Sequence, residues 1–354
     1  MSTAIVAVVV SALLTAVSVG AVRSWSLRAR FLDIPNDRSS HRDPTPRGGG
    51  LGIVLVVWVG CFFWLAGAAV RGCASAVPLA RIGMVLAAAM GVAVISWADD
   101  IAHGLKPLTR LGVHLISAAA VLAALGWWRQ ADLPLFGTVQ IGALGPLFTI
   151  LWLVGLLNAF NFMDGIDGIA AGQAATASLS WMVIGLGLRI ETLAIAAGLL
   201  LGASLAFLVY NWHPAKIFMG DVGSAFLGFS FAVVPLYAAW PAEGRLSVRL
   251  PVVGFLVMAP FVMDAALTFA RRLRRGERVY EAHRSHAYQR LAMSGLGHAK
   301  VAIFYVLLGA AGGASAIAFL FLEDRTKASL VAVVGGLVIA LAPRAWLKAR
   351  AGRM

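Results

Sequence analysis

Long apolar runs separated by short polar segments dominate the whole chain. Eleven runs are predicted to be bilayer-spanning helices, because about 20 apolar residues in helical form cross the hydrocarbon core. Helices satisfy their own backbone hydrogen bonds, which lipid cannot do. The pattern therefore predicts an all-α polytopic membrane protein with a single transmembrane domain over residues 1–354. The predicted spans are 4–22, 51–70, 79–97, 108–127, 146–159, 169–188, 192–210, 225–240, 250–270, 299–322 and 328–342.

The polar segments between the runs carry an uneven distribution of positive charge. Arg23, Arg28 and Arg30 directly follow the first run, so the positive-inside rule places its C-terminal end in the cytoplasm and the N-terminus outside. The C-terminus is then cytoplasmic, and 21 of the 29 lysines and arginines fall on the cytoplasmic side. A Gly- and Pro-containing segment, 133–141, predicts a small external β-hairpin. The predicted cytoplasmic loops are 23–50, 98–107, 158–168, 211–224 and 271–298.

Composition agrees with a membrane protein. Hydrophobic residues make up 60% of the chain and charged residues 13%, which is more apolar than a soluble protein of 354 residues. In a soluble protein the net charge of +13 would suggest nucleic acid. Here the basic residues lie in short loops beside the spans, which indicates that they set the orientation of the protein in the membrane and attract anionic partners. We therefore expect no nucleic-acid partner. The two cysteines, Cys61 and Cys73, do not indicate a disulfide framework.

A dense polar stretch, 158–168, interrupts the apolar background. Asn158, Asn161, Asp164 and Asp167 recur every three residues, and on a helix the two aspartates would share a face. A glycine follows each aspartate, which lets an anion or a metal approach the backbone closely. Polar groups at a membrane boundary are costly, which favours a functional site. The alternative interpretation is two polar helix ends that meet at a loop.

Two further acidic motifs stand at the predicted cytoplasmic side. Asp99 and Asp100 end the third run, and adjacent carboxylates repel each other unless a cation lies between them. Mg²⁺ prefers oxygen ligands and often uses carboxylates together with substrate phosphates. Asp221 lies among glycines just before an apolar run, so we expect its carboxylate at a helix start that is open to a cation or phosphate. The alternative for the aspartate pair is a solvated helix end.

Basic residues flank these acidic motifs. Arg47 precedes three glycines, 48–50, whose backbone N–H groups could bind an anion. A Pro/Gly turn with orienting arginines is an equally supported interpretation. Asp264 lies near the inner end of the ninth run, where it needs a partner, and Arg271 and Arg272 are nearest in sequence.

The last cytoplasmic loop is strongly basic and contains His283-Arg284-Ser285-His286. This group suits a diphosphate better than a metal, because the neighbouring cations would compete with a metal. All of these motifs lie on one predicted face, which indicates chemistry there. A transporter or flippase for a polyprenyl-linked sugar, the main alternative class, would concentrate its polar site near the midplane. A scaffold of a polysaccharide assembly complex would need no carboxylate cluster.

Five motifs, in this order and over nearly the whole chain, resemble those of the polyprenyl-phosphate N-acetylhexosamine-1-phosphate transferases of glycosyltransferase family 4. The resemblance implies that a UDP-N-acetylhexosamine gives its sugar-1-phosphate to undecaprenyl phosphate, with UMP as the second product. It also implies Mg²⁺ or Mn²⁺, the bacterial inner (plasma) membrane and a cytoplasmic active site, and it leaves a homodimer open. The motifs are 46–49, 99–100, 158–168, 214–224 and 283–290.

The resemblance also implies roles for individual residues. Asp221 would be a Mg²⁺ ligand with Asp100, Asp99 would act near the metal and the lipid phosphate, and uracil would stack on Phe218. The acceptor phosphate is already anionic at neutral pH, so we favour direct attack over a covalent aspartyl intermediate. The other implied catalytic residues are Asp164, Asp167, His283 and His286, and the other implied substrate contacts are Arg47, Asn158, Asn161, Asn211, Lys216 and Arg284.

The histidine loop bears on the branch of the family. The branch that transfers phospho-muramoyl-pentapeptide has three consecutive histidines, whereas this chain has His283 and His286 with Arg284 and Ser285 between them. The chain is therefore more similar to the transferases that initiate O-antigen synthesis, whose donors include UDP-GlcNAc and the 6-deoxy sugars FucNAc and QuiNAc. We expect initiation of O-antigen or a related cell-envelope polysaccharide, with the pentapeptide transferase as the alternative.

Overall fold

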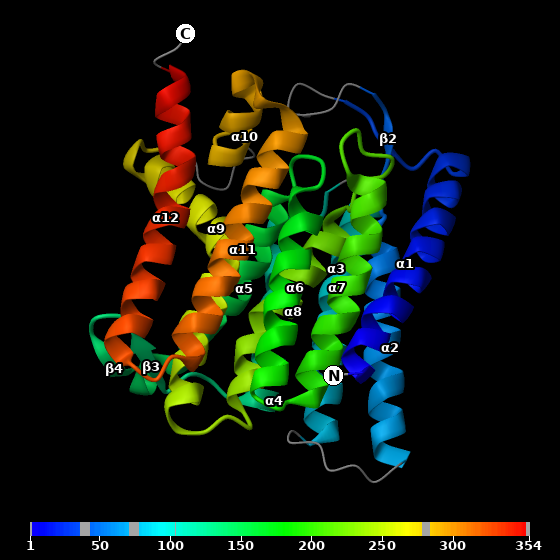
Figure 1. The fold of residues 1–354 in the computed structure, drawn as a ribbon. Helices are drawn as coiled ribbons and strands as arrows, with labels where there is room; N and C mark the ends of the chain where they lie inside the picture. Colours follow the sequence, from blue (N-terminus) through cyan, green and yellow to red (C-terminus); the bar gives the residue numbers. More distant parts are fainter. Residues whose placement is uncertain (1, 36–42, 71–77, 103, 278–283, 352–354) are drawn as a thin grey trace.

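The computed structural model describes residues 2–35, 43–70, 78–102, 104–277 and 284–351 (Figure 1). Within these residues, eleven helices are long and apolar enough to cross a membrane. This confirms the predicted all-α polytopic fold class. The N- and C-terminal ends of the chain lie at opposite ends of the helical bundle (Figure 1), as an odd number of crossings requires.

The spanning helices follow one another with short connections. In chain order they are α1 (Ser2–Arg28), α2 (Gly50–Val70), α3 (Leu79–Ala102), α4 (Pro107–Leu125), α5 (Gly145–Met163), α6 (Ile169–Gly187), α7 (Glu191–Asn211), α8 (Asp221–Ala239), α9 (Gly244–Arg274), α11 (Gly297–Phe321) and α12 (Arg325–Ala351). The short elements are β1 (Leu32–Asp33), β2 (Thr45–Pro46), β3 (Gln130–Leu133), β4 (Gly137–Gln140), the 3₁₀ turn η1 (Gly142–Leu144), α10 (Ala287–Leu291) and the π-helical turn η2 (Ala292–Leu296).

Helix α8 lies at the centre of the bundle, and most of its residues are buried. Small residues let the neighbouring helices approach closely, as is typical of packing in membranes. A Cβ at Gly228 of α8 would lie 2.9 Å from the Cα of Leu157 on α5. A Cβ at Gly202 of α7 would lie 2.1 Å from the carbonyl oxygen of Val8 on α1. The first residue of α8, Asp221, is therefore carried by a tightly held helix.

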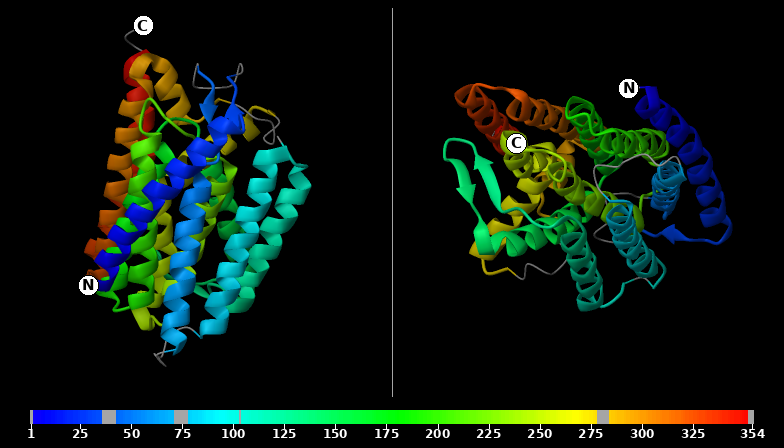
Figure 2. Two further views of the ribbon diagram at one scale, coloured as in Figure 1. Left: turned by 90° about the vertical axis from the view of Figure 1, so that its right-hand side faces the viewer. Right: turned by 90° about the horizontal axis from the view of Figure 1, so that it is seen from below.

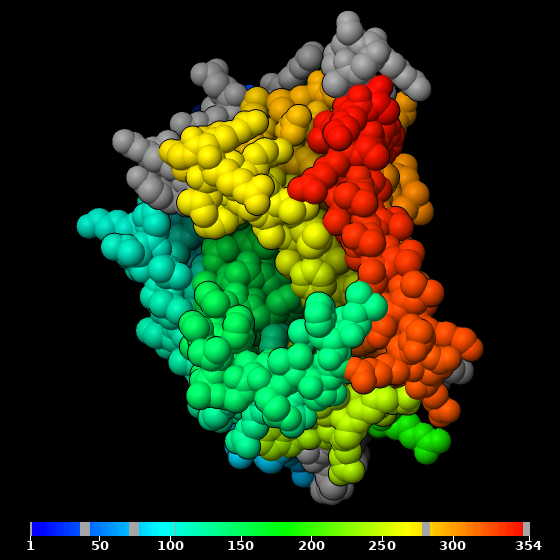
Figure 3. Space-filling model, turned by 90° about the vertical axis from the view of Figure 1, so that its left-hand side faces the viewer, coloured from blue at the N-terminus to red at the C-terminus, as the bar shows by residue number. Residues whose placement is uncertain are grey.

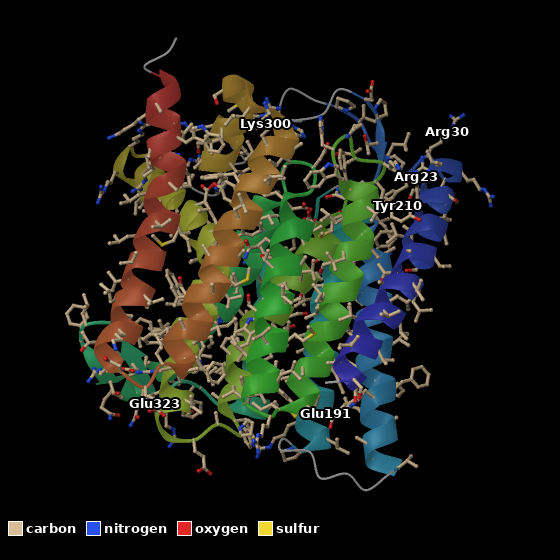
Figure 4. The ribbon with its side chains drawn as sticks, viewed as in Figure 1. Arg23, Arg30, Glu191, Tyr210, Lys300 and Glu323 are labelled. Atoms are coloured by element: carbon tan, nitrogen blue, oxygen red, sulfur yellow. The ribbon has the colours of Figure 1, made fainter. Side chains whose placement is uncertain are left out.

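The charged side chains separate toward the two ends of the bundle. Arg23, Arg30 and Lys300 lie at one end, and Glu191 and Glu323 lie at the other (Figure 4). The first of these ends also carries β2, the α7–α8 connection and α10 (Figure 1). We call it the motif end, because the sequence motifs that suggested chemistry lie there.

Several helices extend further than their hydrophobic runs indicate, and α5 is the one that changes the picture of the site. Helix α5 continues to Met163, so Asn158 and Asn161 lie on a helix and not in a loop. Asp164 directly follows that helix, and Asp167 lies in the turn before α6. The prediction that these two aspartates share a helix face is therefore wrong. Glycine ends the turn, because Gly168 adopts φ 78°, in the left-handed region that favours glycine.

The predicted β-hairpin is present at the opposite end of the bundle. Strands β3 and β4 pair antiparallel, with Gln130 opposite Gln140 (Figure 2, right). The predicted spans place Arg249 at the end of the loop between residues 240 and 250. In the structure α9 already begins at Gly244, and Arg249 is buried within this helix. Its Nε lies 3.1 Å from Oδ2 of the buried Asp132 of β3, and its Nη1 donates to the Phe319 carbonyl at 2.8 Å. This buried ion pair fastens the hairpin to α9 and α11.

Replacing Asp132 by Asn is expected to lower the free energy of unfolding by about 3 kcal/mol, because it leaves a buried guanidinium without its counter-charge. Unfolding of the purified protein in detergent measures the loss. Glu323→Gln, an exposed change at the same end, is the matched control. Equal stability of the two variants would contradict a stabilising role for this ion pair.

Candidate active site

Asp100 connects α3 to the first turn of α8. The helix α3 continues to Ala102, so Asp100 lies in its last turn and not in a loop. Its Oδ1 accepts a hydrogen bond from the backbone N–H of Asp221 at 3.1 Å, and its Oδ2 accepts one from Val222 at 3.0 Å. Arg47 forms an ion pair with the same carboxylate. A carboxylate stabilises the free N–H groups and positive dipole of a helix start, so this contact fixes Asp221 where the sequence predicted it, at a helix N-terminus.

Arg110 of α4 bridges two of the predicted aspartates. Its Nη1 lies 2.5 Å from Oδ2 of Asp99 and 3.4 Å from Oδ2 of Asp221. The other oxygen of Asp99 accepts a hydrogen bond from the backbone N–H of Leu105. The sequence analysis missed Arg110 because it falls inside the predicted span 108–127. A charge in the first turn of an apolar helix was the signal that could have found it.

Asp164 faces the same cluster from the α5–α6 connection. Burial, followed by repulsion from Asp221, Asp100 and Asp167, raises the pKa of Asp164 to about 7. Among the described residues its carboxylate forms no hydrogen bond or ion pair. Two mutually repelling carboxylates, Asp164 and Asp221, are the arrangement that a divalent cation stabilises.

The carboxylates of the cluster are oxygen ligands of the kind that Mg²⁺ prefers. The sequence prediction paired Asp221 with Asp100. Both oxygens of Asp100 are engaged by Arg47 and by the first turn of α8, whereas Asp164 has no such partner among the described residues. Asp164 therefore has more oxygens available to a cation than Asp100, which holds the start of α8 in place.

The segment from Asn158 to Gly168 is fixed by side chains from two distant helices. The hydroxyl of Tyr288 donates to the carbonyl of Phe162 at 3.0 Å. A Cβ at Gly165 would lie 2.1 Å from that hydroxyl, so only glycine fits there. Asn211, at the end of α7, accepts a hydrogen bond from the Gly168 N–H at 2.9 Å. Asn211 thus orders the turn that presents Asp164.

Asp167 lies beside two histidines. The Nδ1 atoms of His213 and His298 lie 2.6 Å and 3.4 Å from its Oδ2. Burial acts to raise the pKa of Asp167, but hydrogen bonding with His298 and His213 outweighs it and lowers the pKa below its usual value. These three residues could hold a metal ion; two nitrogen ligands suit a transition metal better than Mg²⁺. The sequence analysis singled out neither histidine.

The glycines after Arg47 have a packing role. Gly49 and Gly50 donate their N–H groups to the carbonyls of Phe218 and Met219, at 2.9 Å and 2.8 Å. A Cβ at Gly50 would lie 2.3 Å from the Cα of Gly223, so glycine lets α2 begin against α8. The interpretation that these two amides bind an anion is therefore wrong.

The α7–α8 connection carries two of the predicted substrate contacts. Phe218 is half-buried, and its N–H donates to the carbonyl of Pro46 at 2.8 Å. Lys216 is exposed, and its carbonyl accepts a hydrogen bond from Arg23 at 3.2 Å. Both residues therefore lie on a loop that β2 and α1 hold in place beside the aspartate cluster.

His286 lies at the start of α10 and is buried beside Asp264. Its Nδ1 lies 3.4 Å from Oδ1 of Asp264. That carboxylate also accepts hydrogen bonds from the Tyr305 hydroxyl at 2.6 Å and from the N–H groups of Ala287 and Tyr288 at 2.8 Å and 3.0 Å. Asp264 therefore orders α10 and sets the position of His286.

The remaining predictions for the basic loop have mixed outcomes. The arginines expected to pair with Asp264 bond elsewhere: Arg271 donates to the Ser285 carbonyl, and Arg272 lies 2.8 Å from Glu277. Arg284 is half-buried at the edge of the described part of the loop. His283, a predicted catalytic residue, lies outside the described residues.

A cavity of about 420 Å³ lies between α5 and α9 and reaches the histidine loop. Figure 3 shows this face of the molecule, hollowed between green residues of α5 and yellow residues of α9. Its walls are mainly apolar, and its polar residues include Asn158, Arg272 and His286. We call this cavity the α5–α9 groove. Its lining includes Phe162, two residues before Asp164.

Comparison with known proteins shows the family of this chain. Residues 82–239 match the family described as glycosyl transferase family 4. The chain is 32% identical to decaprenyl-phosphate N-acetylglucosaminephosphotransferase of Mycobacterium tuberculosis (strain ATCC 25618 / H37Rv), over 93% of this chain and 85% of that protein. It is 29% identical to the probable undecaprenyl-phosphate N-acetylglucosaminyl 1-phosphate transferase of Bacillus subtilis (strain 168), over 88% of this chain and 84% of that protein.

A third relative matches only in part. Phospho-N-acetylmuramoyl-pentapeptide-transferase of Latilactobacillus sakei subsp. sakei (strain 23K) is 36% identical over 38% of this chain and 42% of that protein. The motifs, the eleven apolar helices and the first of these relatives together identify the enzyme class. The chain belongs to glycosyl transferase family 4, the polyprenyl-phosphate N-acetylhexosamine-1-phosphate transferases.

Proposed function

We propose that this transferase moves N-acetylglucosamine 1-phosphate from UDP-GlcNAc to undecaprenyl phosphate, with Mg²⁺, at the cytoplasmic face of the bacterial plasma membrane. The observation that carries the proposal is the aspartate and arginine cluster at the start of α8, beside a groove between two spanning helices. The names of the two relatives that match over most of their length specify GlcNAc and a polyprenyl phosphate. The distribution of positive charge supports the cytoplasmic face.

The cluster suits a reaction between two phosphate-bearing substrates. Asp164 and Asp221 would hold Mg²⁺, which supplies charge neutralisation to the diphosphate when bound. Arg110 and Arg47 add fixed positive charge near the same place. An oxygen of the acceptor phosphate attacks the sugar-linked phosphorus of the donor. The bond from that phosphorus to the bridging oxygen breaks, and UMP leaves with the electron pair.

The arrangement of Asp99 and Asp100 supports direct attack by the acceptor. Each carboxylate is engaged by an arginine and by backbone N–H groups, so neither presents a free oxygen as a nucleophile or base. The acceptor phosphate is already anionic at neutral pH and needs no strong base. These two residues therefore act by holding Arg110, Arg47 and the start of α8 in position.

The α5–α9 groove suits the acceptor. Its walls are mainly apolar and belong to two helices that could span a membrane, and the hydrocarbon chain of a polyprenyl phosphate needs an apolar surface to bind. Asn158, Arg272 and His286 supply polar groups that can orient the phosphate at the motif end.

In the donor site, Phe218 would stack on uracil. Initiation of O-antigen or a related cell-envelope polysaccharide stays a prediction from the histidine loop.

A panel of donors tests the sugar. UDP-GlcNAc or a 6-deoxy relative should support UMP release, UDP-glucose should be poor, and UDP-muramoyl-pentapeptide should be inactive. A pocket that hydrogen-bonds the acetamido group leaves buried partners unpaired with glucose, which lowers kcat/KM by orders of magnitude. Robust use of the pentapeptide donor would contradict the branch assignment and leave the family assignment intact.

The raised pKa of Asp164 predicts a pH dependence of Mg²⁺ binding. With a pKa of about 7, the carboxyl is mostly protonated at pH 6 and mostly ionised at pH 8. Because a proton competes with the metal, Mg²⁺ should bind about tenfold more tightly at pH 8 than at pH 6. Calorimetric titration without substrates measures this, and Asp164→Asn should flatten the dependence. A wild-type affinity that is equal at both pH values would remove Asp164 from the proposed metal site.

A further inference from the structure

A second cavity at the motif end lies between α9, α10 and α12, with a volume of about 650 Å³. Figure 3 shows the motif-end parts of α9 (yellow) and α12 (red) side by side. Its lining is strongly basic, with one buried carboxylate, Asp264, that is already engaged by four hydrogen-bond donors. The six cations of this cavity are Arg271, Arg274, Arg275, Arg290, Arg344 and Lys348.

Most of this charge has no counter-charge within the described residues. Among the residues that the structure describes, the one ion pair of these six cations is a long contact of 3.8 Å between Arg275 and the exposed Glu277. Arg271 donates a hydrogen bond to the backbone carbonyl of Ser285, and this neutral acceptor does not neutralise the positive charge of the arginine. Arg344 and Lys348 lie four residues apart on α12, so their like charges repel each other on one helix face. An anion between α9 and α12 would relieve this repulsion.

The deeper part of the cavity is apolar. Pro260 and Met263 of α9 and Ile339 of α12 line it there, further along these helices from the motif end than the arginines. A soluble anion would contact only the cations and leave these side chains uncovered. A ligand with an anionic head and hydrocarbon chains would cover both parts. Basic cavities between spanning helices near the membrane surface are a known form of lipid headgroup site.

We propose that this cavity binds one anionic phospholipid, with its phosphodiester among the six cations and its acyl chains against α9 and α12. The cavity is separate from the α5–α9 groove. The residues that line the two lie on different faces of α9, with Thr268 shared. The lipid site therefore does not depend on the proposed transfer reaction.

Asp264 gives the lipid site a connection to the enzyme. It lines the basic cavity, it accepts hydrogen bonds from the first turn of α10, and it lies beside His286. His286 lines the α5–α9 groove. A bound lipid would thus hold α9, α10 and α12 together next to that groove, and we expect it to raise the thermal stability of the protein.

Lipid titration of the purified full-length protein in a non-ionic detergent tests the site. Dioleoyl-phosphatidylglycerol should bind and raise the Tm, and dioleoyl-phosphatidylcholine should do neither. Binding is followed by native mass spectrometry. The double variant Arg344→Gln/Lys348→Gln should bind phosphatidylglycerol roughly thirtyfold more weakly, as expected when two cations are removed from beside a phosphodiester. Arg274→Gln, on the opposite wall, should weaken binding in the same direction.

The matched control is Arg28→Gln/Arg30→Gln, which removes the same charge from exposed positions of α1 and its connection. It should bind the lipid as the wild type does. Equal losses in the two double variants would show general surface attraction and overturn the proposal. Equal binding of phosphatidylcholine would also overturn it. Inorganic phosphate should give no shift; if it reproduced the full rise in Tm, a free anion and not a lipid would be the ligand.

Discussion

Replacing Asp221 by Asn is expected to lower kcat by about a hundredfold to a thousandfold, the usual loss when one charge-stabilising group is removed. The structure places this carboxylate at the first residue of α8, close to Arg110 and to the repelling carboxylate of Asp164. The amide keeps the shape but removes the charge that would hold Mg²⁺. UMP release at saturating Mg²⁺ and donor measures the effect.

The control for Asp221→Asn is Asp324→Asn, an exposed aspartate before α12. It should leave turnover unchanged. The Asp221 variant should unfold at the same temperature as the wild type, because the Asp100 contacts to α8 use backbone N–H groups that the substitution retains. Turnover of the Asp221 variant within a factor of a few of wild type would remove Asp221 from the metal site.

Replacing Arg110 by Gln is expected to lower kcat by about a hundredfold. Arg110 is the cation that lies between Asp99 and Asp221. Without it, these two carboxylates and the nearby Asp164 repel one another with less positive charge to offset the repulsion. Arg110→Lys should recover part of the activity, because it restores the charge without the planar guanidinium whose Nη1 lies between Asp99 and Asp221. UMP release under the same conditions measures both variants.

Arg129→Gln, an exposed arginine after α4, is the control for Arg110. It should behave as the wild type. If Arg110→Gln kept full activity, Arg110 would be a structural partner of Asp99 alone. If Arg110→Lys were as inactive as Arg110→Gln, the fixed two-sided contact would matter more than the charge.

The membrane fold could be predicted from the sequence because lipid imposes one simple requirement, a long apolar helix, at every crossing. The residues at which the helices begin and end could not be predicted from the apolar runs, because a helix can continue beyond the hydrocarbon region. Asp99 and Asn158 lower the hydropathy of their segments, yet both lie on helices that continue past the hydrocarbon pattern. Arg249 gave the same error at the start of a helix: its charge indicated a loop, but α9 already begins at Gly244, and a distant aspartate allows the arginine to be buried.

The motif residues were recognisable because so many polar groups stand among apolar neighbours. Their partners were not, because these lie far apart in the sequence. The capping of α8 by Asp100 joins residues 121 positions apart, and the contact of Tyr305 with Asp264 spans 41. Local periodicity carries no information on such pairs. For this reason the sequence analysis missed Arg110, His213 and His298, and it did not foresee that Asp100 caps α8.

The transfer of a phosphate together with the sugar is the central claim, and a doubly labelled donor tests it most directly. Purified protein is supplied with undecaprenyl phosphate, Mg²⁺ and UDP-GlcNAc labelled with ³²P at the sugar-linked phosphate and with ³H in the uridine. The account predicts that ³²P enters the lipid fraction while ³H is recovered as UMP. Recovery of both labels together as UDP would show transfer of the sugar alone, and recovery of intact donor would show no transferase activity; either result would contradict the account.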